Sequence, residues 1–359
     1  MSLARDIADL GAVTSRLDTV GASSGALSNR NLVINGAMQV AQRGTSSTGI
    51  GASIGYYTLD RYSFILGDAS AGRLTMTQEA DGPVGFANCL KLACTTADTS
   101  IAAGERLFLQ HKIEAQNCQA IGKGKTGAKP FTVSFYVKAN AAKTYGLEIF
   151  QSDHNRQCTK LFNVTTDWTR VELTFPADVD DGSSPIADDN GEGLVLQWQL
   201  HAGSNYTSGT LNSSAFADNV NANRAGGIDS FFSSTSNTFF LTGVQVEVGS
   251  TATDFEHRLF GDELQKCKRY YQKSRNVDVY SGDSDRGGEV TFRGENSGST
   301  QMYQWYGFPV EMRADPTITT EGTAPDDITS TLIGTNGFRA GYSTDNNHYN
   351  FYYYADSEL

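Results

Sequence analysis

The acidic loop DVDDGSSPIADDNGEG, residues 178–193, holds the densest group of residues that could do chemistry. Calcium ions take oxygen ligands from loops of this composition, so Asp178, Asp180 and Asp181 are candidate calcium ligands. The spacing does not follow the EF-hand pattern, and an acidic hairpin tip is ordinarily only solvated. We therefore expect no obligatory cofactor, with calcium at these three residues as the alternative.

Other motifs associated with catalysis or nucleotide binding are incomplete. In GKGKTG, residues 122–127, the first glycine of a phosphate-binding loop would fall at Gln119, and Pro130 and a strand follow where a helix is needed. The histidines show no metal-ligand spacing, and no GxSxG motif is present. Two carboxylates on distant strands could still hydrolyse a glycoside, so this alternative stays open although we predict that the protein is not an enzyme.

Aromatic residues near the end of the sequence are the candidates for ligand binding, because sugar rings stack on Trp and Tyr faces. They are Trp305 and Tyr306 in MYQWYGF, and Tyr352 and Tyr354 in YNFYYYADSEL. Alternation places aromatic residues on both faces of these strands. One face must then be covered by something other than the domain's own core, and exposed apolar surface more often marks a neighbouring subunit than a ligand.

Strands of alternating polarity must position these residues. The clearest alternating segments are FTVSFYVKA, TDWTRVELTF, GLVLQWQLH and GVQVEV, residues 131–139, 166–175, 193–201 and 243–248. One apolar and one polar face per strand is typical of an antiparallel sandwich, and Trp198 shares its face with leucines, which predicts a core position. The 37 glycines and the charged fraction of only 19% also favour strands and turns over surface helices. We predict an all-β fold.

The sequence divides into three predicted regions. Residues 1–30 form a helix and a linker, residues 31–258 a β-sandwich, and residues 259–359 a linking helix and a smaller C-terminal β domain. The first helix carries a short coiled-coil-like seam of Leu3, Ile7, Leu10 and Leu17. This helix either joins copies of the chain or rests on its own domain. The linking helix should line one side with Phe260, Leu264, Cys267 and Tyr271.

The exit from the last sandwich strand, GSTATDFEHR, raises the question of chemistry at Asp254, Glu256 and His257. At the junction between two β regions, we expect these residues to cap and hydrogen-bond the backbone.

Composition excludes several classes of function. A formal net charge of −12 opposes binding to nucleic acid and to anionic membranes. No segment has the length and hydropathy of a signal peptide or a membrane span, so we expect no membrane insertion. The five cysteines are scattered without a CxxC pair, which indicates reduced and mostly buried thiols.

Several stretches together resemble structural proteins of tailed bacteriophages, of the tail-fibre or receptor-binding kind. They include NLVINGAMQVAQRGTS, YYTLDRYSF, FTVSFYVKA, DWTRVELTFPAD, LTGVQVEVGSTATDFEHRLFGDELQKCKRYYQKS and FPVEMRADPTIT, with ADSEL at the end. Tyr62 departs from the resemblance, which leads us to expect tryptophan after DR. The resemblance covers most of residues 31–359. It implies a jelly-roll sandwich similar to carbohydrate-binding modules, carried on a virion fibre or spike that is usually trimeric.

The resemblance further implies a non-enzymatic virion protein that binds a host-surface receptor such as a glycan, with the C-terminal region at the tip. Its partners would be other virion proteins, from the tail or a fibre adaptor, and the host glycan. It would assemble in the host cytoplasm and leave in virions at lysis. A structural connector or decoration protein is the first alternative, and a polysaccharide depolymerase is the second.

Overall fold

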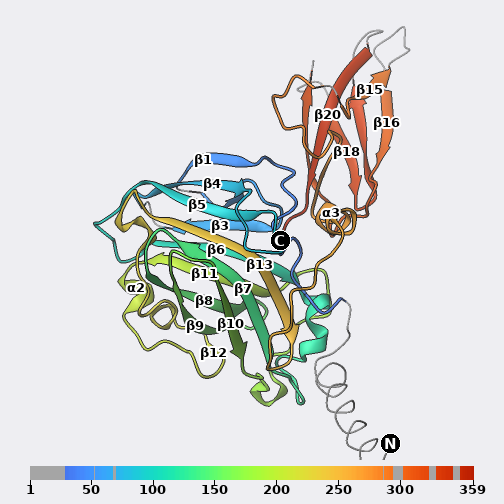
Figure 1. Cartoon of the computed structure of the whole chain (residues 1–359). Helices are drawn as coiled ribbons and strands as arrows, with labels where there is room; N and C mark the ends of the chain where they lie inside the picture. The colour runs from blue at the N-terminus through green and yellow to red at the C-terminus, as the bar shows by residue number, and fades with distance from the viewer. Residues whose placement is uncertain are drawn as a thin grey trace, which may run out of the picture.

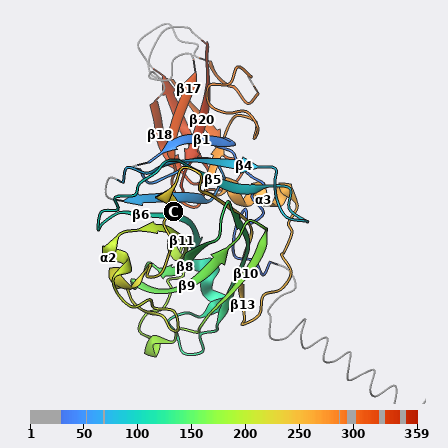
Figure 2. The same cartoon turned by 60° about the vertical axis from the view of Figure 1, so that its left-hand side comes forward.

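The described residues form a large β-sandwich and a smaller β domain, and helix α3 (Phe260–Lys268) lies where they meet (Figure 1, Figure 2). The computed structural model describes residues 29–359 except 52, 68–69, 286, 294–301, 323–328 and 343–347. The predicted all-β fold is confirmed. The predicted N-terminal helix, with Leu3, Ile7, Leu10 and Leu17, lies outside the described residues.

Two antiparallel sheets form the sandwich. Sheet A has the order β1 (Ser46–Ile50), β4 (Arg73–Glu79), β5 (Cys89–Thr96), β13 (Thr238–Val248), β7 (Phe131–Ala139) and β10 (Thr169–Phe175). Sheet B has the order β12 (Ala217–Asp218), β9 (Arg156–Val164), β8 (Lys143–Gln151), β11 (Glu192–Ala202), β6 (Arg106–Glu114), β3 (Tyr62–Gly67) and β2 (Gly55–Tyr56). The chain passes repeatedly from one sheet to the other, as in β6, β7 and β8, which gives the jelly-roll arrangement.

The alternating residues of the predicted strands fill the space between these sheets. Leu194, Leu196 and Leu200 of β11 are buried in the core with Trp198, as predicted. The Trp198 ring meets the Phe135 ring edge-on, with the ring centres 5.8 Å apart. The five cysteines are free and buried, as expected.

Short helices occupy the connections between strands. They are α2 (Ser204–Thr207) and the 3-10 helices η2 (Ala115–Ile121), η3 (Asp180–Gly182), η4 (Asn221–Asn223) and η5 (Phe231–Ser233).

The smaller domain packs two further sheets face to face. Sheet C centres on β20 (His348–Asp356), which pairs with β14 (Tyr271–Lys273), β15 (Val290–Arg293) and β17 (Thr317–Gly322). Sheet D has the order β16 (Met302–Gly307), β19 (Gly337–Tyr342) and β18 (Thr329–Gly334). Phe338, Phe351 and Tyr353 form the centre of the core between the sheets.

The predicted face of the linking helix is wrong in two places. Helix α3 ends at Lys268, so Tyr271 belongs to strand β14, and Phe260 is 47% exposed at the start of the helix. The side that faces the sandwich carries Glu263 and Cys267. Glu263 accepts a hydrogen bond from the backbone N–H of Asn35, which binds the helix to the beginning of the sandwich.

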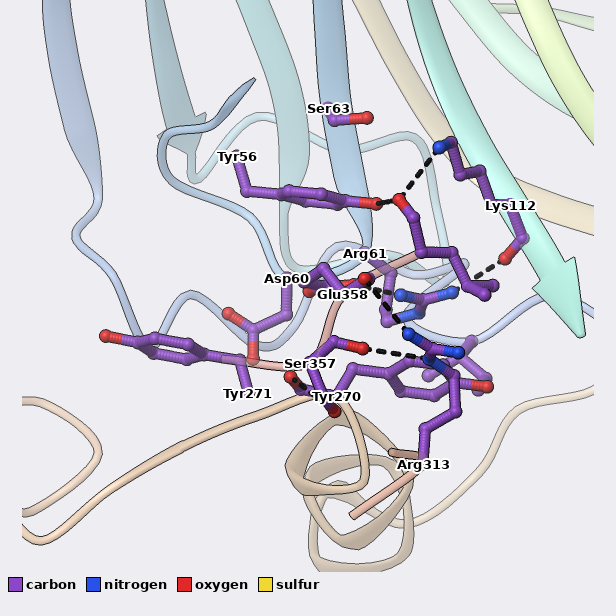
Figure 3. Close-up of polar contacts among 12 residues, drawn as sticks. Tyr56, Asp60, Arg61, Ser63, Lys112, Tyr270, Tyr271, Arg313, Ser357 and Glu358 are labelled. Carbon is purple, nitrogen blue, oxygen red and sulfur yellow. Dashed lines mark hydrogen bonds and ion pairs between the residues drawn. The ribbon is translucent and has the colours of Figure 1, made fainter. Parts of the chain in front are cut away.

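Buried charges join the two domains (Figure 3). The Arg61 side chain is 1% exposed, forms an ion pair with Glu358, and lies 3.4 Å from the centre of the Tyr270 ring. Arg43 lies in the same way 3.7 Å from the centre of the Tyr271 ring. Residues on both sides of the junction therefore share one network of ion pairs and cation–π contacts.

Candidate functional site

One carboxylate of the acidic loop, that of Asp178, is buried and pairs with basic side chains. Asp178 accepts hydrogen bonds from Arg156, at 2.8 and 3.0 Å, and from the Lys123 ammonium at 2.8 Å. Burial alone would raise the pKa of Asp178, but these bonds hold it below its usual value. Asp180 also pairs with Arg156, at 3.2 Å.

These ion pairs bear on the calcium prediction for Asp178, Asp180 and Asp181. A calcium ion at Asp178 would have to displace a lysine and an arginine from the carboxylate. In the part of the chain that the structure describes, no group of three or more His, Cys, Asp or Glu residues is placed to hold a metal ion. Calcium binding stays an untested prediction, without geometric support from this loop.

The first pair of predicted ligand residues is split between the two faces of strand β16. Trp305 is 51% exposed on the outer face of sheet D. Tyr306 points the opposite way, and its ring lies 5.6 Å from that of Phe338 and 5.4 Å from that of Phe351. Tyr306 therefore belongs to the core of the smaller domain, and Trp305 belongs to its surface.

The second pair, Tyr352 and Tyr354, is covered by the chain itself. The Arg275 guanidinium lies 3.5 Å from the centre of the Tyr352 ring. The Tyr354 hydroxyl donates to Glu321 at 2.5 Å and accepts from Arg275 at 3.1 Å. Our expectation that a subunit or a ligand must cover this face is wrong, because Arg275 and its loop cover it.

The outer face of sheet D carries a group that we name the aromatic platform, formed by Tyr303, Trp305 and Arg339. Tyr303 precedes Trp305 by two residues on β16, so both side chains lie on one face, and Tyr303 is 46% exposed. Arg339 stands directly opposite Trp305 on β19. Its guanidinium lies 4.0 Å from the centre of the Tyr303 ring, which is a cation–π distance.

Glycines support the indole of Trp305. A Cβ atom placed on Gly337 would lie 2.7 Å from Cζ2 of the indole, which shows that the ring lies directly over this backbone. Nε1 of the indole is 3.8 Å from the corresponding position of Gly307. The two glycines pair with each other across the strands. The indole therefore rests on bare backbone and still exposes half of its surface.

Sequence reasoning missed Tyr303 and Arg339. The alternation of MYQWYGF was a sufficient signal for Tyr303, because residues 303 and 305 share one face of a strand and 306 lies on the other. No local signal marks Arg339, because its position beside Tyr303 depends on the pairing of β16 with β19.

The sandwich offers a different polar surface, on the outer face of sheet B. Glu148, Gln197 and Gln199 lie there, but Arg224 from the segment after η4 covers them. Arg224 donates to both oxygens of Glu148, at 2.8 and 2.9 Å, and to Gln197 at 2.8 Å. These polar groups satisfy one another and are buried, so they present no open binding surface.

Glu256 and His257, which follow the last strand of the sandwich, make contacts within the fold. Glu256 accepts the backbone N–H of Asn31 at 2.9 Å, and Arg258 donates to the carbonyl of Val33 at 2.9 Å. His257 packs against the Phe86 ring, with the ring centres 5.1 Å apart. The expectation of a hydrogen-bonded junction is confirmed for Glu256.

Membrane insertion by a helix has no candidate among the described residues, since none of their helices has the length and apolar character to span a bilayer.

Comparisons with known proteins give only distant likenesses. No family model matches the sequence, and no curated protein matches it. A family 11 carbohydrate-binding module from Clostridium thermocellum, in complex with a mixed-linked tetrasaccharide, has 10% identity and a TM-score of 0.28, covering 59% of this chain and 98% of the module. The xylan-binding domain of a Paenibacillus barcinonensis protein has 10% identity and a TM-score of 0.30, covering 65% and 100%.

A phage protein is also among the similar structures. The enzymatically active domain of tailspike protein 4 from bacteriophage CBA120 has 11% identity and a TM-score of 0.31, covering 61% of this chain and 21% of that one. At identities and TM-scores this low, these likenesses say nothing of the function of this chain.

Proposed function

We propose that the protein is a non-enzymatic virion fibre or spike protein that binds a host-surface glycan through the aromatic platform. The exposed indole of Trp305 carries the glycan part of this proposal. It lies against glycine backbone beside Tyr303, and exposed aromatic rings of this kind stack on the apolar faces of sugar rings. The virion location, the trimeric state and the other virion partners rest on the sequence resemblance.

Adsorption of the purified full-length protein to host cells, and its competition with infection, test the proposal. Trp305→Ala should weaken adsorption by about tenfold, which corresponds to roughly 1.4 kcal/mol of binding energy. Phe260→Ala is the matched control, because Phe260 is an aromatic of similar exposure at the start of α3. Equal adsorption by the wild type and the Trp305 variant would contradict the proposed site.

A structural connector is the second candidate, and the junction favours it. The Arg61–Glu358 ion pair and the Arg43–Tyr271 contact join the two domains, and a connector that transmits force between virion proteins needs such a junction. A connector would bind other virion proteins tightly and would show no affinity for cells or glycans. Pull-down of the full chain with virion proteins, run beside the adsorption assay, distinguishes the two functions.

A further inference from the structure

The acidic loop contains one of the three Asn-Gly pairs of the sequence. The pairs are Asn35–Gly36, Asn190–Gly191 and Asn336–Gly337. In such a pair the glycine carries no side chain that would hinder attack of its backbone nitrogen on the asparagine amide. We propose that the protein carries out this reaction on itself at Asn190, with Asp189 as the base. The reaction is independent of glycan binding.

The reaction forms one bond and breaks another before water enters. The Gly191 nitrogen bonds to Cγ of Asn190, and the bond from Cγ to Nδ2 breaks. The proton of the Gly191 N–H passes to Asp189 and then to the leaving nitrogen, which departs as ammonia. Water opens the resulting cyclic imide and leaves aspartate or isoaspartate at position 190.

The carboxylate of Asp189 lies on the N–H group that must lose its proton. Oδ1 of Asp189 accepts a hydrogen bond from the backbone N–H of Gly191 at 2.8 Å, which is the reach that a general base needs. A Cβ atom placed on Gly191 would lie 2.9 Å from this oxygen. Glycine therefore leaves room for the base as well as for the attack.

Helix η2 and its first neighbour hold the loop on both sides of Asn190. The carbonyl of Asp189 accepts the N–H of Gln116 at 2.9 Å, and the carbonyl of Gly191 accepts the N–H of Ala115 at 3.0 Å. The base and the nucleophile are thus fixed relative to each other, which reduces the ordering that the reaction needs. Asn190 itself is exposed, so water reaches the imide.

The other two Asn-Gly pairs have different surroundings. Asn35 is fully buried, and its amide both donates to the carbonyl of Val40 at 2.8 Å and accepts the N–H of Val40 at 2.9 Å. Asn336 is exposed, but Gly337 belongs to strand β19 and pairs with Gly307 on β16. We therefore expect Asn190 to react first.

Asn190 also contacts the smaller domain, so its conversion changes the junction. Its Nδ2 donates to the carbonyl of Arg313 at 2.5 Å, and the Arg313 guanidinium donates to the Asn190 carbonyl at 2.9 Å. The same guanidinium binds the carbonyl of Ser357 at 2.8 Å (Figure 3). After conversion to aspartate, a carboxylate oxygen replaces the amide donor and faces the Arg313 carbonyl. The reaction therefore weakens this contact between the domains.

The test follows the full-length protein during incubation at mildly alkaline pH. Peptide mapping by mass spectrometry detects the imide by its loss of ammonia and the opened product by a gain of about 1 Da. Conversion at Asn190 should be about tenfold faster than at Asn336, because only Asn190 has the positioned base. No conversion at Asn190, or equal rates at the two sites, would overturn the proposal.

A variant of Asp189 tests the base. Asp189→Asn keeps an oxygen that can accept the Gly191 N–H but cannot take the proton, so it should slow the conversion about tenfold or more. Asp188→Asn is the matched control, because Asp188 is the neighbouring exposed acid, and it should leave the rate unchanged. Equal rates in the wild type and Asp189→Asn would overturn the role of Asp189.

Asn190→Asp supplies one product without the reaction. Loss of the hydrogen bond to Arg313 should lower the unfolding temperature by about 2 °C. An unchanged unfolding temperature would overturn the effect on the junction.

Discussion

Asp60 holds its carboxyl group inside the junction between the two domains. Both of its oxygens accept hydrogen bonds from Gln42, one from the backbone at 2.9 Å and one from the side chain at 2.5 Å. Burial raises the pKa of Asp60 to about 6, although Arg43 and Gln42 oppose this effect. The folded protein therefore binds a proton at Asp60 more tightly than the unfolded chain does.

This shift predicts how stability changes with pH. Because the pKa of Asp60 is higher in the folded state, the contribution of this group to stability is greatest below about pH 4 and falls as the pH rises to about 6. Asp60→Asn removes the titration. Between pH 4 and pH 7 the free energy of unfolding of the wild type should fall relative to the variant by on the order of 3 kcal/mol. Denaturant titrations at several pH values measure this, and parallel curves for the two proteins would contradict it.

At the scale of single residues, the sequence predicted burial better than it predicted sites. Trp198 and the leucines of β11 alternate in the sequence and alternate in the structure. Residue type predicts one kind of site for Trp305, Tyr306 and Tyr352, but the structure places their side chains in different environments. A tyrosine is equally suited to a core, a cation–π contact or a ligand site, and only its surroundings decide.

At the scale of elements, the pairing of β16 with β19 makes the aromatic platform. Gly337→Ala would place a Cβ atom 2.4 Å from the carbonyl oxygen of Tyr306 and 2.7 Å from the Trp305 indole. We expect it to destabilise the smaller domain by about 1–3 kcal/mol and to weaken adsorption to cells. Gly334→Ala on β18 is the control, because its nearest atom is 3.6 Å away. Thermal unfolding of the two variants, together with adsorption, checks this prediction, and equal behaviour of both would refute the packing argument.

Strand β13 shows why alternation predicted the fold but not the strand register. Phe239 and Leu241 point into the core at odd positions, whereas Val244 and Val246 do so at even positions. The change of phase occurs at Gly243, where φ is +62° and the register with β7 shifts. A bulge of this kind needs glycine for its left-handed backbone, but glycine alone does not distinguish a bulge from a turn. The same limit applies to the platform, because the contact of Tyr303 with Arg339 follows from strand register.

At the scale of the whole molecule, the junction should make the two domains unfold together. Arg61→Met removes the ion pair with buried Glu358, the hydrogen bond to the Lys112 carbonyl and the contact with the Tyr270 ring. Breaking a buried pair by removing one partner destabilises by about 3 to 5 kcal/mol. We expect calorimetry to show one unfolding transition for the wild type and two for Arg61→Met.

The control for the junction is an ion pair at the surface. Lys138 pairs with Asp81 at 2.6 Å, and the Asp81 side chain is half exposed. Lys138→Met should change stability by no more than about 1 kcal/mol and leave a single transition. Two transitions in the wild type itself would show that the junction does not couple the domains.

The smaller domain is attached to the sandwich at two places in its sequence. The chain enters it through α3, where Glu263 binds Asn35, and returns to the sandwich through Glu358, which binds Arg61 (Figure 3). A domain that is joined by one linker can rotate about that linker. A domain whose first and last segments both contact its neighbour cannot rotate in this way. If sheet D binds a ligand that is fixed on a flat surface, the sandwich would therefore be held in one orientation relative to that surface. Binding through the smaller domain would then orient the sandwich as well as attach it.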